Sequence, residues 1–211
     1  DIISTTDYKK GVFRPGHGCV FSPEGTDDYY FAYLEFGRRS TNRQTYVNRL
    51  EFNEDGTMRP VELSLEGVGA LRKVKREKIK VDTIYASSIA EALHIKPMKD
   101  TLCRRTEYFV PAFAADGANG SRWMAADRDN ESWIVADLGT TRKVRRTEVY
   151  FVRPTAGHAY LLEGSNDGKV WEACGGHEDI RIQSPHTDAP GKKYRYLRIK
   201  ISEGVKGIWE W

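Results

Sequence analysis

The sequence has few cysteines and no long apolar run, and these two shortages narrow the class of protein. Its three cysteines, Cys19, Cys103 and Cys174, are far apart and form no C-x-x-C pair. The odd number argues against a disulfide framework, and the missing pair argues against a zinc site. The longest apolar stretch, residues 109–115, is far shorter than the roughly 20 residues of a membrane-spanning helix. We therefore expect no membrane span.

The sequence also lacks an initiating methionine and the apolar core of a secretory signal peptide. It opens with Asp1 and a polar stretch. We expect the chain to be a processed or cut product, so the lack of a signal says nothing about secretion.

No sign of charge prevails, since the net charge is +3 in 211 residues. One block, residues 72–80, carries six basic residues and one acidic residue, and the rest of the chain is slightly acidic. Such a block is typical of attraction to a nucleic acid or a membrane surface, or of a solvated linker or a lysine-protected edge strand. We favour the linker or edge strand and expect no nucleic-acid partner.

Hydrophobic and aromatic residues alternate with polar ones at the period of β-strands, with turn clusters between the runs. The predicted strands are residues 18–21, 29–35, 45–52, 133–138, 147–152, 159–163 and 193–201. Asp55-Gly56 is typical of a hairpin turn, and residues 88–94 are expected to form one short helix that Pro97 ends. Short strands at this spacing favour an all-β sandwich or barrel. We place a domain boundary after residue 75, giving domains 1–75 and 76–211.

The second half carries four ordered motifs, PAFAADGANGSRW (111–123), WIVADLG (133–139), YLLEGSNDGKVW (160–171) and GIWEW (207–211). Together with the basic strand YLRI at 196–199, they resemble the coagulation-factor-5/8 type C (discoidin) module. The resemblance covers roughly residues 79–211 and implies a jelly-roll, galactose-binding-like β-sandwich. Many members of that family are carbohydrate-binding modules of secreted glycoside hydrolases.

The resemblance also implies a structural calcium ion in the second domain. Side-chain oxygens and flexible backbone are concentrated at residues 116–121, and Ca²⁺ takes six to eight oxygen ligands. Carried over from the family, the ligands are Asp116, Asn119, Ser121 and the terminal-strand Glu210. The alternative is an Asx-turn without metal, and we favour the metal.

The tryptophans Trp123, Trp133 and Trp171 are expected in the core rather than as sugar-stacking platforms. Sugar sites in the resembled family lie in loops at one end of the sandwich and use an aromatic face with a few polar groups. The candidates here are Arg153, His158, His177, His186 and Trp209.

The first half resembles the last blade of the five-bladed β-propeller of family 43 glycoside hydrolases. The resemblance rests on RPGHGCVF (14–21), the aromatic strand YYFAY (29–33) and residues 42–56, which end in the Asp-Gly hairpin. It implies that His17 lies at the propeller axis near a bound ion, and that Arg43 faces the sugar pocket. The alternative for His17 is a turn histidine with a satisfied hydrogen bond, and the alternative for Arg43 is a surface charge at a strand end. We favour the roles in the sugar pocket for both residues.

Inverting hydrolysis needs two carboxylates that flank the glycosidic bond. In the resembled family these lie on earlier blades, and the acidic residues here are expected in hairpins or at exposed strand positions: Asp27, Asp28, Glu35, Glu51 and Asp55. We therefore expect this chain alone to be inactive, and the missing blades to belong to a parent chain or a separate polypeptide.

The sequence thus predicts the C-terminal part of a secreted, periplasmic or cell-surface glycoside hydrolase. The parent enzyme would be similar to arabinofuranosidases or xylosidases acting on plant polysaccharide. The alternative is a non-catalytic discoidin-type adhesion module that binds glycans or proteins.

Overall fold

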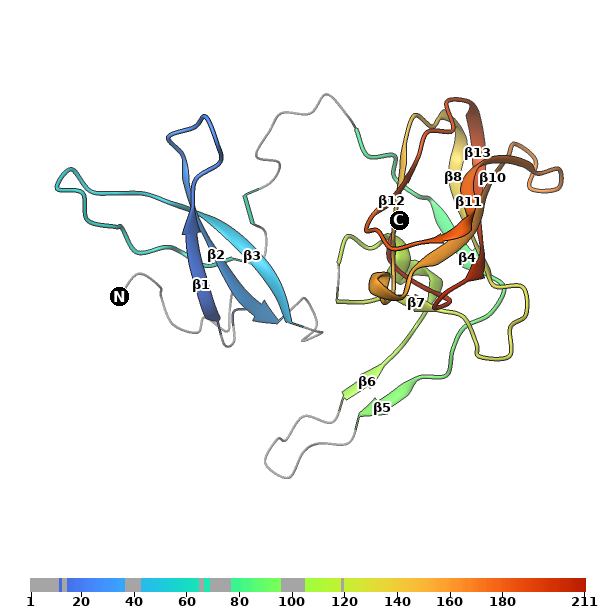
Figure 1. The fold of residues 1–211 in the computed structure, drawn as a ribbon, viewed down its shortest axis with the longest axis horizontal. Helices are drawn as coiled ribbons and strands as arrows, with labels where there is room; N and C mark the ends of the chain where they lie inside the picture. Colours follow the sequence, from blue (N-terminus) through green and yellow to red (C-terminus); the bar gives the residue numbers. More distant parts are fainter. Residues whose placement is uncertain are drawn as a thin grey trace. The chain divides into compact units, whose positions relative to one another are not determined.

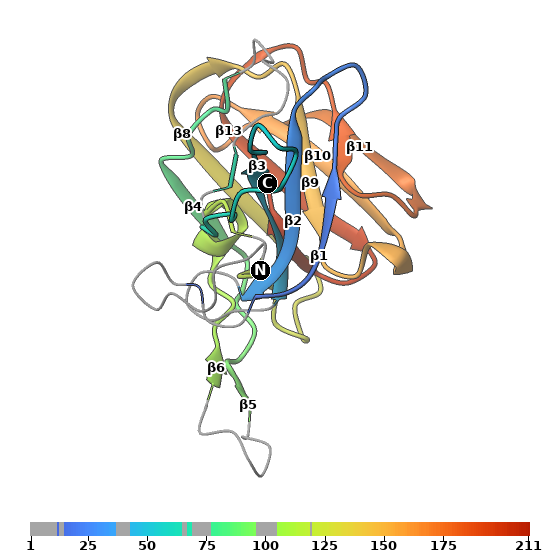
Figure 2. The ribbon, with the colours of Figure 1, turned by 90° about the vertical axis from the view of Figure 1, so that its left-hand side faces the viewer.

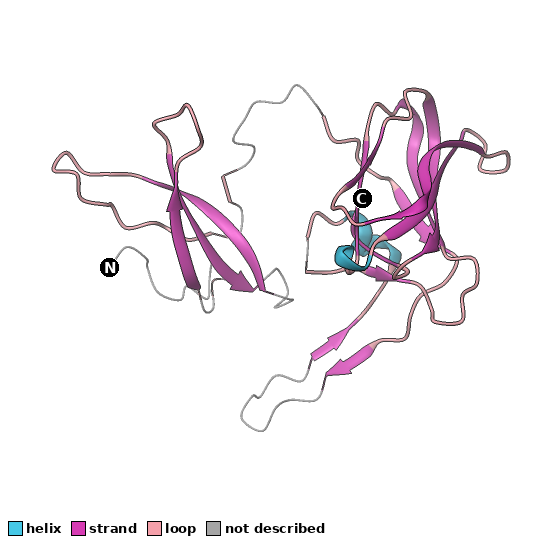
Figure 3. Ribbon diagram, in the orientation of Figure 1, coloured by secondary structure: helices cyan, strands magenta, loops and turns pink. Residues whose placement is uncertain are grey.

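The computed structural model describes residues 12, 15–36, 43–64, 67–68, 77–95, 105–118 and 120–211. The chain divides into two compact units, residues 1–77 and 78–211. The boundary expected after residue 75 lies two residues earlier. Both units are built from strands (Figures 1 and 3), and among the described residues helix is limited to short 3-10 turns. No helix in the described ranges is long and apolar enough to cross a membrane.

The first unit contains a three-stranded antiparallel sheet in the order β1-β2-β3. Its strands are β1 (Gly16–Phe21), β2 (Tyr29–Phe36) and β3 (Arg43–Leu50). All three were predicted, because aromatic and β-branched residues alternate along them. The Asp55-Gly56 turn is confirmed: Phe52 and Met58 form a β-bridge across it, and Gly56 has a positive φ of 81°.

One face of this sheet holds a small core, which includes Phe31, Tyr33 and Leu50. The Tyr33 hydroxyl donates to Ser64 O (2.6 Å) and accepts from Ser64 N (3.0 Å), and it also lies 2.8 Å from Asn48 Oδ1. Burial raises the pKa of Tyr33 to about 12. These contacts fasten the segment around Ser64 over the sheet.

The second unit is a β-sandwich of two antiparallel sheets, and the all-β prediction is therefore confirmed. One sheet has five strands in the order β11-β10-β13-β8-β4, which lie side by side in Figures 1 and 2. These strands are β4 (Thr83–Ala86), β8 (Trp133–Lys143), β10 (His158–Ser165), β11 (Glu172–Arg181) and β13 (Lys193–Glu203). The other has the order β12-β9-β14-β7, formed by β7 (Trp123–Met124), β9 (Thr147–Phe151), β12 (His186–Asp188) and β14 (Gly207–Glu210).

The core of the second unit lies between these sheets, because each contributes every second side chain to it. The five-stranded sheet supplies Ile134, Leu162 and Ile199, and the other sheet supplies Phe151 and Ile208, all at most 1% exposed.

The helix predicted for residues 88–94 is wrong. Ser88 lies in the connection between β4 and β5 that has no regular secondary structure, and β5 (Leu93–Ile95) pairs with β6 (Arg105–Glu107) in a hairpin that extends from the sandwich (Figure 1). Ser88 Oγ donates to Asp129 Oδ2 (2.5 Å) and accepts from Ala126 N (3.0 Å). Contacts with a segment some 40 residues away therefore hold this stretch out of a helix.

Candidate functional site

The loop after the 3-10 turn η3 (Pro111–Ala115) carries the residues expected to bind calcium, and Glu210 of β14 lies against it. Asp116 accepts hydrogen bonds from Ala118 N (2.9 Å) and from Ser121 Oγ (2.6 Å). Glu210 Oε2 accepts from Gly117 N (3.1 Å). Asn119, the fourth expected ligand, lies outside the described residues. The structure thus brings two carboxylates and one hydroxyl to the same loop.

A lysine is also part of this cluster, because the Lys78 ammonium pairs with Glu210 Oε1. Carboxylate, hydroxyl and carbonyl oxygens are the ligands that Ca²⁺ prefers, so the donor set suits that ion. Within the described ranges no three His, Cys, Asp or Glu side chains group to hold a metal. A cation here would therefore rely partly on carbonyl oxygens and would compete with Lys78 for Glu210.

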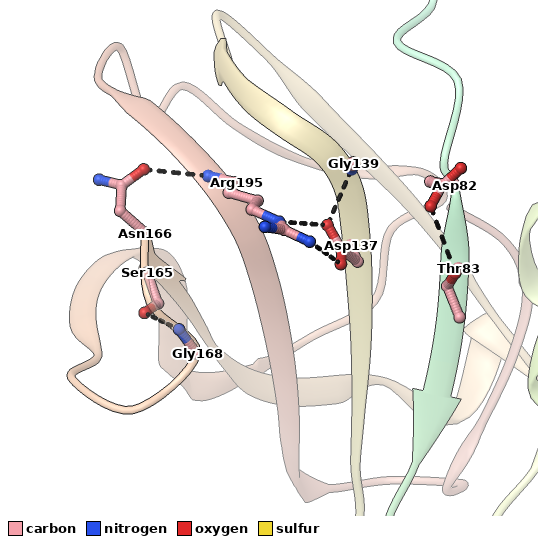
Figure 4. A network of polar contacts seen from close by, with 8 residues as sticks. All are labelled: Asp82, Thr83, Asp137, Gly139, Ser165, Asn166, Gly168 and Arg195. Atoms are coloured by element: carbon pink, nitrogen blue, oxygen red, sulfur yellow. Dashed lines mark hydrogen bonds and ion pairs between the residues drawn. The ribbon is translucent and has the colours of Figure 1, made fainter.

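A second polar network joins three strands of the five-stranded sheet (Figure 4). The Arg195 guanidinium makes two 3.0 Å hydrogen bonds to the Asp137 carboxylate, which also accepts from Gly139 N at 2.8 Å. These bonds, those from Arg195 first, lower the pKa of Asp137. Asn166 Oδ1 accepts from Arg195 N (3.1 Å), and Ser165 Oγ accepts from Gly168 N (3.0 Å). Polar residues of the motifs WIVADLG (133–139) and YLLEGSNDGKVW (160–171) therefore make hydrogen bonds that stabilise the sheet and the hairpin turn after β10.

Three of the predicted sugar-binding residues form a histidine cluster at one edge of the sandwich. His158 and His186 are 0% exposed. The His158 ring stacks on Phe151 with 4.5 Å between ring centroids, and the His186 ring stacks on His177 at 5.0 Å. His177 Nε2 lies 2.8 Å from His186 Nδ1. A surface ligand cannot reach His158 or His186 while the sheets remain packed.

Burial, followed by the nearby His177 and His158, lowers the pKa of His186 to about 4. Burial likewise lowers the pKa of His158. Among the described residues, neither His186 Nε2 nor His158 Nδ1 has a hydrogen-bond partner. Both imidazoles therefore favour the neutral form, and the stability of this part of the sandwich depends on pH.

The other two sugar-binding candidates lie elsewhere. Arg153 is exposed and has a positive φ of 54°, just before the 3-10 turn η4 (Pro154–Ala156). Trp209 on β14 is half-buried, and the Arg122 guanidinium lies 4.9 Å from its ring centroid. Arg122 also pairs with Glu107 at 3.0 Å. One face of the Trp209 indole is thus already covered.

In the first unit, His17 lies in a β-bulge of β1. It is exposed and has a positive φ of 38°, a strained value for a residue other than glycine. Gly18 follows because a Cβ there would lie 2.2 Å from the Phe31 ring. Bulges and strained residues are common where a side chain must be aimed at a ligand. Arg43 begins β3, and its side chain lies outside the described part of the structure.

One acidic residue departs from its predicted position. Glu35 was expected on an exposed strand position, and it is only 1% exposed. It follows Phe31 and Tyr33 at intervals of two along β2, so all three point to the same covered face. The alternation of Phe31, Tyr33 and Glu35 along β2 already indicates one covered face. Glu35 was nevertheless predicted to be exposed because it is charged.

Comparison with known proteins adds to this geometry. Residues 87–211, more than half of the chain, match the F5/8 type C domain. The chain belongs to the F5/8 type C domain family. The matched residues span both sheets of the sandwich except β4, and they include the loop at 116–121, Glu210 and the histidine cluster.

Two relatives are glycoside hydrolases by name. A solved structure of a glycoside hydrolase is 71% identical over the whole of this chain, with a TM-score of 0.81. This chain spans 48% of that chain. A β-D-galactofuranosidase, xynD, of Aspergillus niger is 44% identical over 59 residues, which are 25% of this chain and 16% of that protein.

The tryptophans of the F5/8 type C domain do not share one environment. Trp123 is 0% exposed, as expected for the core. Trp133 and Trp171 are only half-buried, so their assignment to the core is wrong. Trp133 shares a face of β8 with Val135 and Asp137, opposite to the core residue Ile134. Alternation inside the WIVADLG motif is the signal that could have found this outward position.

Proposed function

We propose that this chain is the C-terminal portion of a glycoside hydrolase and that its F5/8 type C domain binds glycan. The 71% identity to a glycoside hydrolase over the full chain carries the proposal. We propose an arabinofuranosidase- or xylosidase-like parent enzyme that acts on plant polysaccharide outside the cytoplasm. The domain would hold the enzyme at the polymer and raise the local concentration of its substrate.

In this proposal the first unit is the last blade of a catalytic propeller. His17 and Arg43 would line the floor of the sugar pocket, with an ion near His17. The strained bulge at His17 supports this role, since it holds an exposed imidazole in a backbone conformation that is costly for a residue other than glycine. The two carboxylates of inverting hydrolysis would be supplied by other blades, on the parent chain or on a separate polypeptide.

The first prediction is that the 211-residue chain binds polysaccharide and hydrolyses no glycoside. In native affinity electrophoresis, soluble arabinoxylan or arabinan in the gel should retard the chain, and dextran should not. No 4-nitrophenol should be released from the α-L-arabinofuranoside, the β-D-xyloside or the β-D-galactofuranoside, because catalysis needs a carboxylate pair. Equal mobility in every gel would overturn the proposed glycan-binding function, and turnover would overturn the proposed division of labour.

We further propose that Asp116, Ser121 and Glu210, with Asn119, hold a structural calcium ion. The ion would neutralise two carboxylates and fasten β14 to the loop after η3. The hydrogen bond from Trp211 N to Ala114 O (2.7 Å) joins the same two segments, so the ion would reinforce a contact that the fold already makes.

The second prediction is that calcium stabilises the second unit. At 100 times the dissociation constant, a ligand that binds only the folded state adds about 2.7 kcal/mol to the free energy of unfolding. We expect a gain of this order in thermal or urea unfolding with CaCl₂ against EDTA. Asp116→Ala should abolish it, and Lys78→Ala should lower the calcium concentration that is needed.

Asp167→Ala is the matched control. Asp167 also caps a loop, accepting from Lys169 N (2.8 Å) and Val170 N (2.9 Å), but the loop carries no carboxylate from a second segment within the contacts described. It should leave the calcium effect unchanged. A calcium effect that survives Asp116→Ala would place the ion elsewhere.

A further inference from the structure

The outer face of the five-stranded sheet carries aromatic and charged residues in adjacent rows. Tyr85, Val135, Arg198 and Glu163 are cross-strand neighbours on β4, β8, β13 and β10. They alternate with core residues such as Ile134, so this row points away from the core. The pairs Trp133–Lys200 and Asp137–Tyr196 stand two positions to either side of Val135–Arg198. We call this surface, with Trp171, the aromatic face.

Four aromatic side chains are partly open to solvent on the aromatic face. Tyr85 is 41% exposed and packs edge-on against Trp133, with 6.1 Å between ring centroids. Trp171, just before β11, lies over the Arg198 guanidinium at 4.1 Å, and Tyr196 lies 4.9 Å from that of Arg195. From β4 to β11 there are four strand spacings, or about 19 Å. A ligand that touches both ends of the face must therefore be extended.

The charges on the aromatic face are largely paired. Arg198 Nε donates to Glu163 Oε2 at 2.7 Å, and Arg195 holds Asp137 through two bonds. Paired charges disfavour a nucleic acid, whose binding depends on cations that neutralise phosphates. They also disfavour an ordinary protein partner, because the core of a protein interface is depleted of charged residues.

The same charged groups keep hydrogen-bonding capacity. Among the described residues, Arg198 makes a hydrogen bond only through Nε, which leaves its Nη groups as donors. Planar donors fixed by an ion pair, beside aromatic rings, match a ligand that has both apolar C–H faces and hydroxyl groups. A neutral polysaccharide has both, and it needs no net charge on the protein.

We propose that the aromatic face binds a neutral polysaccharide chain, laid across strands β4 to β11. This inference rests on the proposed glycan-binding function and assigns it to the face of the sheet rather than to the loops at one end. Trp171 and Tyr85 are the stacking platforms, and Arg198 supplies hydrogen bonds to the hydroxyl groups.

The test is a titration of the full chain with soluble arabinoxylan, followed by isothermal calorimetry and by affinity electrophoresis. Trp171→Ala and Tyr85→Ala should each weaken binding at least about tenfold, since stacking residues dominate such contacts. Tyr108→Ala is the matched control, because Tyr108 is 61% exposed and lies beyond β6, outside the aromatic face. It should bind as the unaltered chain does.

A second readout separates contact from folding. In ¹⁵N–¹H spectra, the Trp171 indole signal should shift on addition of arabinoxylan oligosaccharides, and the signal of the buried Trp123 should not. Undiminished binding by both Trp171→Ala and Tyr85→Ala would overturn the assignment of glycan binding to the aromatic face, while the proposed glycan-binding function would remain. No binding by the unaltered chain would overturn both. A face variant that changes the oligomeric state instead would show a contact between copies and overturn the glycan assignment.

Discussion

Replacing Trp123 with alanine should lower the free energy of unfolding of the F5/8 type C domain by about 3–5 kcal/mol, the usual cost of removing a buried aromatic side chain. The indole is 0% exposed in the core between the sheets. Its Nε1 also donates to Ser88 O at 3.0 Å, so the truncation leaves a carbonyl without its partner. Urea unfolding, followed by far-ultraviolet circular dichroism, would measure the loss.

Two further variants give this result its meaning. Trp123→Phe keeps most of the packing and loses the hydrogen bond, so its cost should lie between those of the alanine variant and the unaltered chain. Trp171→Ala should cost less than about 1 kcal/mol, because Trp171 is partly exposed outside the core. Equal losses at Trp123 and Trp171 would contradict the different environments that the structure gives them.

Acid should destabilise the sandwich through its histidine cluster. The pKa of His186 is about 4 in the folded chain and about 6.5 when unfolded. The unfolded chain therefore binds more protons between these values, and stability is lost as the pH falls from 6.5 towards 4. The full loss is about 3 kcal/mol, since each pKa unit is worth about 1.36 kcal/mol. Urea unfolding across this pH range would measure it.

The groups that face His186 shape the result. Asp188 opposes the downward shift of its pKa, and His177, His158 and Arg181 add to it. Carboxyl groups with lowered pKa values, such as Asp129, Asp137 and Glu172, lose their contribution as the pH falls through their ordinary values of 3.8 to 4.5. The window between pH 6.5 and about 5 therefore belongs to the histidines.

His186→Phe should flatten the dependence on pH between 6.5 and 4, because it removes the buried group that must stay neutral. His94→Gln is the control: His94 is exposed on β5, and its ring lies 3.0 Å from Thr106 Oγ1. A loss of stability that persists unchanged in His186→Phe would assign the acid sensitivity to other groups.

The strands that the sequence predicted are those whose side chains alternate over several residues. Each of the seven predicted runs overlaps a strand, because a sheet with one buried face imposes a period of two. Residues 51–52 and 152 were predicted as strand and lie beyond the ends of β3 and β9. Short strands escaped prediction: β7 has two residues and β12 has three, too few for a pattern. The strand β11 escaped because none of its residues is fully buried, so burial imposes no alternation on it.

The candidate site was predicted in part. The motif DGANGS located the loop at residues 116–121, and the terminal motif located Glu210, because the oxygen-bearing side chains lie close together in the sequence or at its end. The pairing of Lys78 with Glu210 was not predictable, since these residues lie 132 positions apart. The aromatic face was missed for a similar reason, as its members come from five separate segments.

By itself, the sequence determined the all-β class, most of the long strands and the loops with turn chemistry, because these depend on interactions between near neighbours. Only the tertiary structure decided which tryptophan lies in the core and which is partly exposed to solvent. An alternating sequence shows that a strand has two different faces, but packing against the other sheet determines which face is buried. It also decided that Ser88 donates a hydrogen bond to Asp129 instead of starting a helix, and that three histidines from separate strands form one cluster. These outcomes depend on which strands become neighbours, and burial follows from that arrangement.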